Sequence, residues 1–416
     1  MPNAAPNHVI VVGAGMVGLS VTWFLQEYGV KVTVLDRKGV AGGSSWGNAG
    51  WLSPGLSIPL PEPSILKYGI KSLMHRDAPL YVPPALDLAL AKFLVAFALR
   101  CTETAWLRAM KAYIPLNNQA LDAYDAMGLG GDGSAVTSAP IMAAFQTRSQ
   151  AKELLRELEM INAAGLPLSS QMLTGPELRE SLTQLSSGVG FGVRIDGQRY
   201  IDPGAFTVSL GEAVVRRGAT IIADKEVVSL SRDRDTVRVG TADGDRISGD
   251  SAVLATGAWM SKLGRPLGVK MPVRAGRGYS FSVPTTGTVA FPVYFPAVRV
   301  ACTPMGDGKL RVAGTMEFAK PDAPANPGRI AAIVRSAKPL LDGVDWERKS
   351  EDWVGSRPVT ADGMPLIGQS ELDGVYIAGG HGMWGVTLGP VTGRLLASQI
   401  VKGEIPDQLR PFAPTR

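Results

Sequence analysis

The sequence predicts an α/β fold (α+β overall) with two parts: a nucleotide-binding domain whose strands are parallel, and a discontinuous second domain built on an antiparallel sheet with helices. Three observations lead to this prediction. A β-α-β pattern opens the chain over residues 9–36, another buried strand of the same kind lies at 250–257, and strand patterns dominate 272–353. The length of 416 residues also exceeds what one hydrophobic core usually supports.

The first β-α-β unit carries three glycines at the spacing Gly13-x-Gly15-x-x-Gly18. Gly13 permits a tight strand-to-helix turn, Gly15 lets the backbone approach a pyrophosphate, and Gly18 lets the helix pack against the strand. The second strand closes on Asp36, whose carboxylate would accept a hydrogen bond from an adenosine ribose. Strand, turn, helix, strand and acid in this order predict dinucleotide binding, and the acid favours FAD or NAD over NADP.

In the first part of the chain, the spacing of apolar residues and the positions of glycine and proline predict the helices, strands and loops. A helix over 17–29 and a strand over 31–35 complete the first unit, and the Gly/Ser-rich stretch 42–50 is a loop. Prolines recur over 59–84, which indicates an excursion into the second domain. Residues 85–100 are very apolar but interrupted by charges, so they either pack as a buried helix or lie on a membrane surface.

Further along, helix and strand patterns alternate, and an acid before a proline marks Asp202 as the N-cap of a helix. We therefore expect the nucleotide-binding domain over 1–60, 200–262 and 355–416, and the second, substrate-binding domain over 61–199 and 263–354. The expected elements are helices over 102–127, 149–164, 203–217 and 391–401, and strands over 141–146, 220–223, 226–230, 250–257, 278–283, 297–303 and 310–315.

Composition narrows the class of protein. With 45% hydrophobic and 19% charged residues, the chain has the composition of an ordinary globular protein. The net charge of +5 comes from scattered basic residues, so nucleic acid is not an expected partner, whereas anionic substrates suit the charge. Cys101 and Cys302 lie far apart and indicate neither a disulfide framework nor a metal site, which fits a reducing cytoplasm. No apolar run is long enough to predict a transmembrane helix.

Two glycine-dense patches lie near the other end of the chain, over 355–368 and 375–390. Glycines at this density just before a helix point backbone N–H groups at an electron-rich partner. A flavin ring, which accumulates charge at N1 and O2 on reduction, is such a partner. The second patch therefore indicates FAD as the dinucleotide.

Together with the opening motif, these patches resemble the glycine oxidase and D-amino-acid oxidase superfamily of FAD enzymes, and most closely its bacterial D-amino-acid dehydrogenase branch. The resemblance implies a Rossmann-like FAD-binding domain. It also implies non-covalent FAD, because the cysteine pattern through which sarcosine oxidases attach FAD is not found here. The matching residues are Gly13, Gly15, Gly18, Ser45, Asn48, Ala49, Gly50, Ser53, Pro54, Gly55, Gly278, Tyr279, Ser280, Arg357, Pro358, Asp362, Gly363, Pro365, Gly380, His381, Gly382 and Gly385.

The resemblance further implies where FAD is held. The loop of residues 44–50 lies along the pyrophosphate and the flavin, Val227 offers backbone contacts to adenine, and residues 380–387 surround the pyrimidine end of the flavin. The expected cofactor-binding residues are Gly13, Ala14, Gly15, Met16, Val17, Gly18, Asp36, Arg37, Ser44, Ser45, Asn48, Ala49, Gly50, Leu52, Val227, Thr256, Gly257, Gly380, His381, Gly382, Met383, Trp384, Gly385, Val386 and Thr387.

Arg357 matches the family arginine that pairs with the substrate carboxylate, a role that suits a planar and permanently charged guanidinium. Tyr279 and Tyr294 either close the pocket or hydrogen-bond a carboxylate, unless they pack in the core as strand tyrosines commonly do. His381 is expected to orient the flavin by a hydrogen bond rather than to abstract a proton, and Trp384 to wall the pocket. The expected catalytic residues are Arg357, Tyr279 and His381.

The activity implied by the resemblance is oxidative deamination of a small amino acid, with a D-amino acid favoured. Hydride leaves Cα for flavin N5, the imine hydrolyses to a 2-oxo acid and ammonia, and the electrons pass to a quinone or another carrier. Alternatives are a sarcosine, glycine or proline-type imino-acid oxidase that uses O2, a non-catalytic flavin-binding subunit, and an NAD-dependent dehydrogenase, which would leave residues 379–385 unexplained. The oligomeric state and peripheral attachment at the inner face of the cell membrane both stay open.

Overall fold

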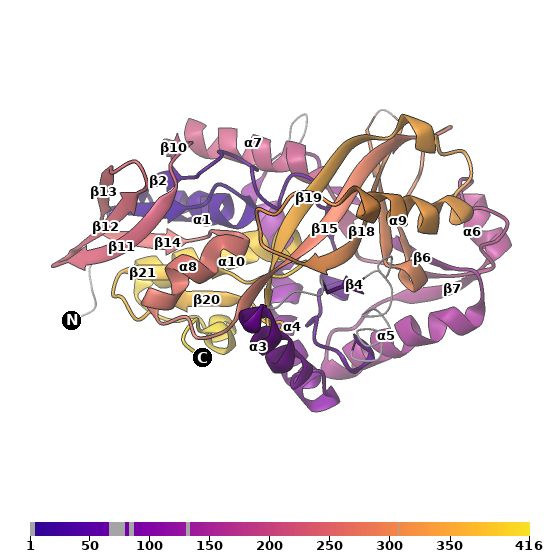
Figure 1. Cartoon of the computed structure of the whole chain (residues 1–416), viewed down its shortest axis with the longest axis horizontal. Coiled ribbons are helices and arrows are strands. Elements are labelled where there is room, and N and C mark those ends of the chain that lie inside the picture. The colour runs from indigo at the N-terminus through magenta and orange to yellow at the C-terminus, as the bar shows by residue number, and fades with distance from the viewer. Residues whose placement is uncertain (1–4, 66–79, 83–86, 130–133, 307) are drawn as a thin grey trace.

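The computed structural model describes residues 5–65, 80–82, 87–129, 134–306 and 308–416. A six-stranded and a nine-stranded sheet dominate the molecule. They lie toward opposite ends of its long axis, with helices α3 (Leu88–Ala98) and α4 (Glu103–Met127) near the middle of the view in Figure 1. The mixed α/β architecture expected from the sequence is confirmed.

The six-stranded sheet is the parallel sheet that the opening pattern predicts. Its order is β10 (Thr220–Ile222), β2 (Lys31–Leu35), β1 (His8–Val12), β14 (Ser251–Leu254), β21 (Val375–Gly379) and β20 (Leu366–Gln369). The first five strands are parallel, and the edge strand β20 runs antiparallel to β21. Residues 9–12 and 251–254 are buried throughout, as expected where both faces of a sheet are covered.

One core joins this sheet to helices α1 (Met16–Glu27), α4, α7 (Pro203–Arg216) and α10 (Gly385–Lys402). Helix α7 begins at the expected N-cap, where Asp202 accepts hydrogen bonds from the N–H groups of Gly204 and Ala205. Helix α4 comes from the segment 61–199, which the sequence assigns to the second domain, yet it packs against α10. The core of the nucleotide-binding part therefore includes a helix from the expected second domain.

Helix α10 begins at Gly385, whereas the sequence predicts a start at residue 391. Pro390 lies inside the helix and has no N–H to donate to the carbonyl of Val386, four residues earlier. The hydroxyl of Tyr124 in α4 donates to that carbonyl at 2.6 Å. A side chain of another helix thus replaces the missing backbone hydrogen bond, and this long-range contact is why the local pattern gave the wrong start.

The nine-stranded sheet contains the antiparallel strands expected over 272–353. Its order is β19 (Ser350–Thr360), β15 (Val273–Pro284), β18 (Lys309–Phe318), β17 (Val300–Met305), β16 (Val293–Phe295), β6 (Ile141–Phe145), β8 (Phe191–Ile195) and β7 (Ser170–Thr174), while β4 (Leu80–Tyr81) also pairs with β18. The strand expected at 297–303 begins only at Val300, because residues 296–298 form a 3-10 turn and Arg299 has a φ of 54°. Strand β6 pairs parallel with β16, which no sequence pattern indicated.

Shorter elements complete the fold. The expected strand at 226–230 is β11, which lies outside the parallel sheet in a small antiparallel sheet. Helix α9 packs on the nine-stranded sheet, and helix α5 contacts α4. The bounds are β3 (Trp51–Leu52), β5 (Thr137–Ser138), α5 (Lys152–Ala164), α6 (Gly175–Ser181), β9 (Arg199–Tyr200), β11 (Val227–Asp233), β12 (Thr236–Thr241), β13 (Arg246–Gly249), α8 (Met260–Gly264) and α9 (Pro327–Ala337).

Helix α3 covers most of the apolar segment 85–100, of which residues 85 and 86 lie outside the described residues. One face of the helix is buried, since Phe93 and Phe97 pack in a core with β18. The opposite face exposes apolar side chains, and Leu88 and Leu99 are each 72% exposed. The helix is therefore buried on one face and exposed on the other. Within the described ranges, no helix is long and apolar enough to cross a membrane.

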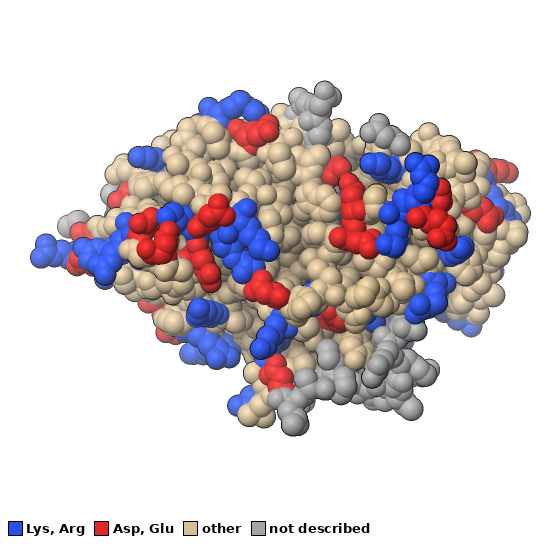
Figure 2. Space-filling model, turned by 45° about the horizontal axis from the view of Figure 1, so that its top comes forward, with Lys and Arg blue, Asp and Glu red and all other residues tan. Residues whose placement is uncertain are grey.

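Charged side chains of both signs are interspersed on the surface. On the face shown in Figure 2, Lys and Arg lie among Asp and Glu. Opposite charges also pair directly, as Arg37 does with Asp322 (2.6 Å) and Arg194 with Asp196 (2.7 Å). On this face the basic side chains lie near acidic ones and do not form one continuous basic patch.

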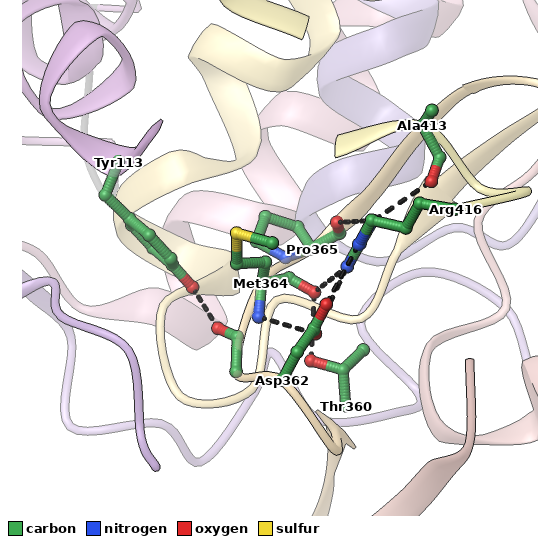
Figure 3. A network of polar contacts seen from close by, with 8 residues as sticks. Tyr113, Thr360, Asp362, Met364, Pro365, Ala413 and Arg416 are labelled. Atoms are coloured by element: carbon green, nitrogen blue, oxygen red, sulfur yellow. Dashed lines mark hydrogen bonds and ion pairs between the residues drawn. The ribbon is translucent and has the colours of Figure 1, made fainter. Parts of the chain in front are cut away.

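The turn between β19 and β20 carries the acid and the glycine of the family motif at 362 and 363. The Asp362 carboxylate accepts hydrogen bonds from Nε of Arg416 (2.9 Å) and from the N–H of Met364 (3.1 Å). Tyr113 of α4 donates to the carbonyl of Gly363 at 2.6 Å (Figure 3). These contacts fix the turn that follows β19, so the two motif residues act here by holding the backbone.

Candidate active site

Two cavities meet between the sheets. The first, about 230 Å³, lies at the carboxyl ends of the parallel strands and is lined by the residues that follow β1, β2, β14 and β21. The second, about 450 Å³, is lined by residues of β18, α3 and α5. Asn48, Arg357 and Met383 line both cavities. The carboxyl edge of a parallel sheet is where ligands of such folds bind, and Arg357 lies at the junction with the second cavity.

The glycine turn after β1 brings a helix close to the strand. Gly13 has a φ of 118°, and a Cβ there would lie 2.4 Å from the carbonyl oxygen of Ala255. A Cβ at Gly18 would lie 1.9 Å from the carbonyl oxygen of Gly13. Side chains at these positions would push α1 away from the sheet. The sequence therefore needs glycine at both positions, for the turn and for close packing.

Two helix N-termini face the first cavity. Gly15, Met16 and Val17 at the start of α1 line it, and so do Gly385 and Val386 at the start of α10. Neither helix has a side-chain hydrogen bond at its N-cap residue. The Met16 N–H donates to the Ser45 hydroxyl at 3.0 Å. The remaining N–H groups of the first turns and the positive ends of two helix dipoles make this cavity suited to negatively charged groups such as a pyrophosphate or a reduced flavin.

Two polar side chains in the lining of the first cavity, Asp36 and Thr256, suit the binding of a dinucleotide. Asp36 accepts hydrogen bonds from the N–H groups of Ala14 (2.8 Å), Lys38 (2.7 Å) and Gly39 (3.0 Å), which hold its carboxylate at the cavity wall. The buried hydroxyl of Thr256 lines the cavity and has no hydrogen-bond partner among the described residues. An unpaired buried hydroxyl is costly, so a ligand in this cavity is the expected partner.

Most of the residues expected to hold FAD line the first cavity. Of the others, Ala14 supports Asp36 through its N–H, Leu52 is fully buried in the core, and the Thr387 hydroxyl donates to the carbonyl of Trp51 at 2.9 Å. The residues that line the first cavity are Gly13, Gly15, Met16, Val17, Asp36, Arg37, Ser44, Ser45, Asn48, Val227, Thr256, Gly257, His381, Gly382, Met383, Gly385 and Val386. Ala49 and Trp384 line the second cavity instead, whereas Ala14, Gly18, Gly50, Leu52, Gly380 and Thr387 line neither.

Arg357 lies in β19 opposite the glycines of β15. A Cβ at Gly278 would lie 2.2 Å from Cζ of Arg357, so this glycine provides the space for the guanidinium. Nη1 of Arg357 donates to the carbonyl of Thr315 at 3.2 Å. That carbonyl is turned by a bulge in β18, where Thr315 has a φ of 54°.

No carboxylate of the described residues pairs with Arg357. Burial lowers the pKa of its guanidinium to about 10, so the side chain is still a cation at neutral pH. Arg357 is only partly exposed, and a partly buried cation without an acidic partner is costly in the absence of a counter-ion. Arg357 is therefore available to bind an anionic group of a ligand at the junction of the two cavities.

His381 lines the first cavity and is 2% exposed. Its Nε2 lies 2.9 Å from the hydroxyl of Thr392, and burial lowers the pKa of the imidazole to about 4. The ring is therefore neutral at physiological pH, and Thr392 holds its orientation. A neutral, oriented imidazole suits a hydrogen bond to a ligand.

The aromatic residues expected around the substrate divide into two groups. Tyr294 and Trp384 line the second cavity. Tyr279 is 1% exposed and lines neither cavity, and its hydroxyl donates to Glu317 at 2.5 Å. Glu317 also pairs with the buried Arg277 at 3.2 Å. The structure thus gives Tyr279 a place in this buried network, away from both cavities.

Several cavity residues were not found from the sequence. Lys225, Trp259 and Lys262 line the first cavity; they follow β10 and β14, and this position at the carboxyl edge is the signal that could have found them. Glu62, Glu153, Glu157, Arg299 and Thr315 line the second cavity. No local signal marks them, because glutamates on an amphipathic helix normally face solvent.

The fold and site define a class: enzymes that bind a dinucleotide at the carboxyl edge of a parallel sheet and place a second, ligand-binding cavity against it. The particular family follows from comparison. The family model described as FAD dependent oxidoreductase matches residues 8–399, and the chain belongs to this family. The protein is therefore an FAD-dependent oxidoreductase, and FAD is its cofactor. The lining of the first cavity gives the residues that would hold it.

Relatives and solved structures agree with this family. A D-amino acid dehydrogenase of Xanthobacter autotrophicus is 32% identical over 409 residues, which cover 96% of both chains. Another, of Methylobacterium nodulans, is also 32% identical over 409 residues and 96% of both chains. Glycine oxidase from Geobacillus kaustophilus has the same fold, with a TM-score of 0.74, 21% identity, and coverage of 99% of this chain and 98% of that one.

Proposed function

We propose that the protein oxidises a D-amino acid to an imine, which hydrolyses to a 2-oxo acid and ammonia, and that a carrier such as a quinone takes the electrons. The observation that carries this proposal is Arg357, a partly buried cation that has no acidic partner among the described residues and lies where the two cavities meet. An amino acid bound there by its carboxylate would hold its Cα at the border of the FAD cavity. The names of the relatives at 32% identity support the D configuration.

The residues of the chain mainly bind and orient the substrate. FAD, when bound without a covalent link, supplies the acceptor for the two electrons and the hydrogen that leave Cα. Arg357 would fix the carboxylate, Tyr294 and Trp384 would exclude water from the second cavity, and His381 would hold the flavin by a hydrogen bond. The N-terminus of α10 would stabilise negative charge that develops near it.

The test is anaerobic reduction of the flavin by amino acids. Purified holoenzyme is mixed with D- and L-enantiomers of small amino acids, and with glycine, sarcosine and proline, and the flavin absorbance is followed. Bleaching by D-amino acids supports the proposal, and bleaching only by L-amino acids, sarcosine or glycine contradicts it. Reoxidation by a quinone without hydrogen peroxide supports a dehydrogenase, whereas rapid peroxide formation in air indicates an oxidase.

Helix α3 supports peripheral attachment to the cytoplasmic face of a membrane as part of this proposal. Leu88, Val95 and Leu99 are exposed along one side of the helix, with Lys92 between them. Co-sedimentation of the holoenzyme with anionic liposomes would support attachment. Loss of co-sedimentation in Leu88→Ser/Leu99→Ser, with flavin content unchanged, would assign it to this face.

A further inference from the structure

The second cavity has an acidic wall that the proposed chemistry does not use. Glu62, Glu153 and Glu157 line it, and apart from Arg357 at the junction the only described cation in the lining is Arg299. Glu62 pairs with Arg299 at 3.6 Å and accepts a hydrogen bond from Ser64 at 2.9 Å. Arg299 therefore forms its ion pair with Glu62, and the carboxyl groups of Glu153 and Glu157 have no such pair among the described residues.

Glu157 is the more enclosed of these two carboxylates. It lies on the inner side of α5, one turn after Glu153, and is partly buried whereas Glu153 is exposed. Burial, and then the charge of Glu62, raise the pKa of Glu157 to about 8. No described residue donates a hydrogen bond to this carboxyl group, and Arg299, which pairs with Glu62, acts on it only through its charge, which lowers the pKa. In the absence of a ligand, the position of this carboxyl group at the cavity wall therefore costs free energy.

An independent observation also indicates a polar ligand in this cavity. Thr315 lines it, is 8% exposed, and its hydroxyl has no hydrogen-bond partner among the described residues. The backbone at Thr315 has a φ of 54°, which a β-branched residue rarely adopts. The unpaired buried hydroxyl of Thr315 lies in the wall next to Arg357, and a polar group of a ligand there would complete its hydrogen bonding.

We infer that the second cavity selects amino acids with a cationic side chain, whose ammonium or guanidinium group binds Glu157 with Glu153 while the carboxylate binds Arg357. This inference rests on the proposed function and names its substrate class. A ligand cation at this wall favours the ionised form of Glu157 and pairs with it, which replaces the hydration that this carboxyl group loses on burial. The volume of about 450 Å³ lies in the range of small-molecule sites and leaves room beyond the junction for a long side chain.

The experiment compares ligands that differ only in the distal cation. D-Norleucine has the four-carbon side chain of D-lysine without its terminal ammonium group. We expect the second-order rate of anaerobic flavin reduction by D-lysine to exceed that by D-norleucine about tenfold or more, the effect of one hydrogen-bonded charge. In Glu157→Gln the advantage should fall close to unity, while D-norleucine changes about twofold at most.

Binding without turnover separates this inference from the proposed function. The perturbation of the flavin spectrum measures how tightly ε-aminocaproate and caproate bind. Only ε-aminocaproate carries the distal ammonium group, and neither compound has an α-amino group to oxidise. Tighter binding of ε-aminocaproate in the wild type, and its loss in Glu157→Gln, would support the inference even if no D-amino acid reduced the flavin. Glu159→Gln is the matched control, because Glu159 is exposed on the same helix and does not line the cavity.

Two results would overturn the inference. One is equal or better reduction by D-norleucine in the wild type, together with equal binding of caproate and ε-aminocaproate. The other is a preference for the cation that Glu157→Gln and Glu159→Gln leave equally intact.

Discussion

Arg357 is held in its position by residues that are neutral. Gly278 provides the space and the carbonyl of Thr315 accepts one hydrogen bond, so the remaining N–H groups can bind a substrate carboxylate. We expect Arg357→Ala to lose about 2 to 5 kcal/mol of transition-state stabilisation, measured as the fall in kcat/KM, which is the cost of truncating a buried charge pair. The kcat/KM of Arg357→Lys should lie between those of the wild type and Arg357→Ala, because a lysine keeps the charge but not the paired hydrogen bonds. Steady-state kinetics with matched flavin content checks this, and an unchanged kcat/KM in Arg357→Ala would remove the assignment.

His381 contributes a dependence of stability on pH. Its pKa falls from 6.5 to about 4 on folding, because burial disfavours the imidazolium. Above about pH 6.5 the imidazole is neutral in both states, and between pH 6.5 and 4 only the unfolded state takes up the proton. The free energy of unfolding should therefore fall in this range by on the order of 3 kcal/mol from this residue alone.

Denaturation of the wild type and of His381→Gln at pH 7, 6 and 5 tests this effect. The variant keeps a group able to contact Thr392 but does not titrate, so the wild type should lose stability faster as the pH falls. Parallel pH profiles for the two proteins would contradict a buried neutral imidazole.

At the scale of elements, Tyr124 of α4 donates a hydrogen bond to α10 at the place where Pro390 removes a backbone N–H. Its hydroxyl satisfies the Val386 carbonyl that Pro390 leaves unpaired. Tyr124→Phe should lower the free energy of unfolding by about 1 to 3 kcal/mol, because a buried carbonyl loses its donor. Pro390→Ala restores the backbone N–H, so the tyrosine change should cost less in that background. Denaturant unfolding of the four proteins of this double-mutant cycle measures the coupling, and additive effects would contradict it.

The same contact shows what the sequence could and could not predict. Strand β2 and the N-cap of α7 were predicted correctly, because periodicity and local hydrogen bonds determine them. The start of α10 and the place of α4 depend on a contact between residues 124 and 386, which no local pattern contains. Arg357 was found because a family motif marks it. Glu157 was not found, because only the packing of α5 against the second cavity distinguishes it from a solvent-facing glutamate.

At the scale of the whole molecule, the first cavity joins the two large sheets. Most of its lining comes from the carboxyl edge of the parallel sheet, but Arg357 and Pro358 come from β19 of the nine-stranded sheet. FAD in this cavity would contact both parts at once. Its binding free energy therefore adds to the stability of the folded chain and to the association of the two sheets.

Removal of FAD should consequently destabilise the whole molecule. Adding FAD back to about 100 times its Kd should stabilise the folded state by about 2.7 kcal/mol, since FAD binds the folded state alone. The midpoint of thermal unfolding of the apoprotein should then rise with FAD concentration. FMN should have a smaller effect, because it lacks the adenosine that the Asp36 end of the cavity is expected to bind. A midpoint that does not respond to FAD, or that responds equally to FMN, would show that this cavity does not hold the complete dinucleotide.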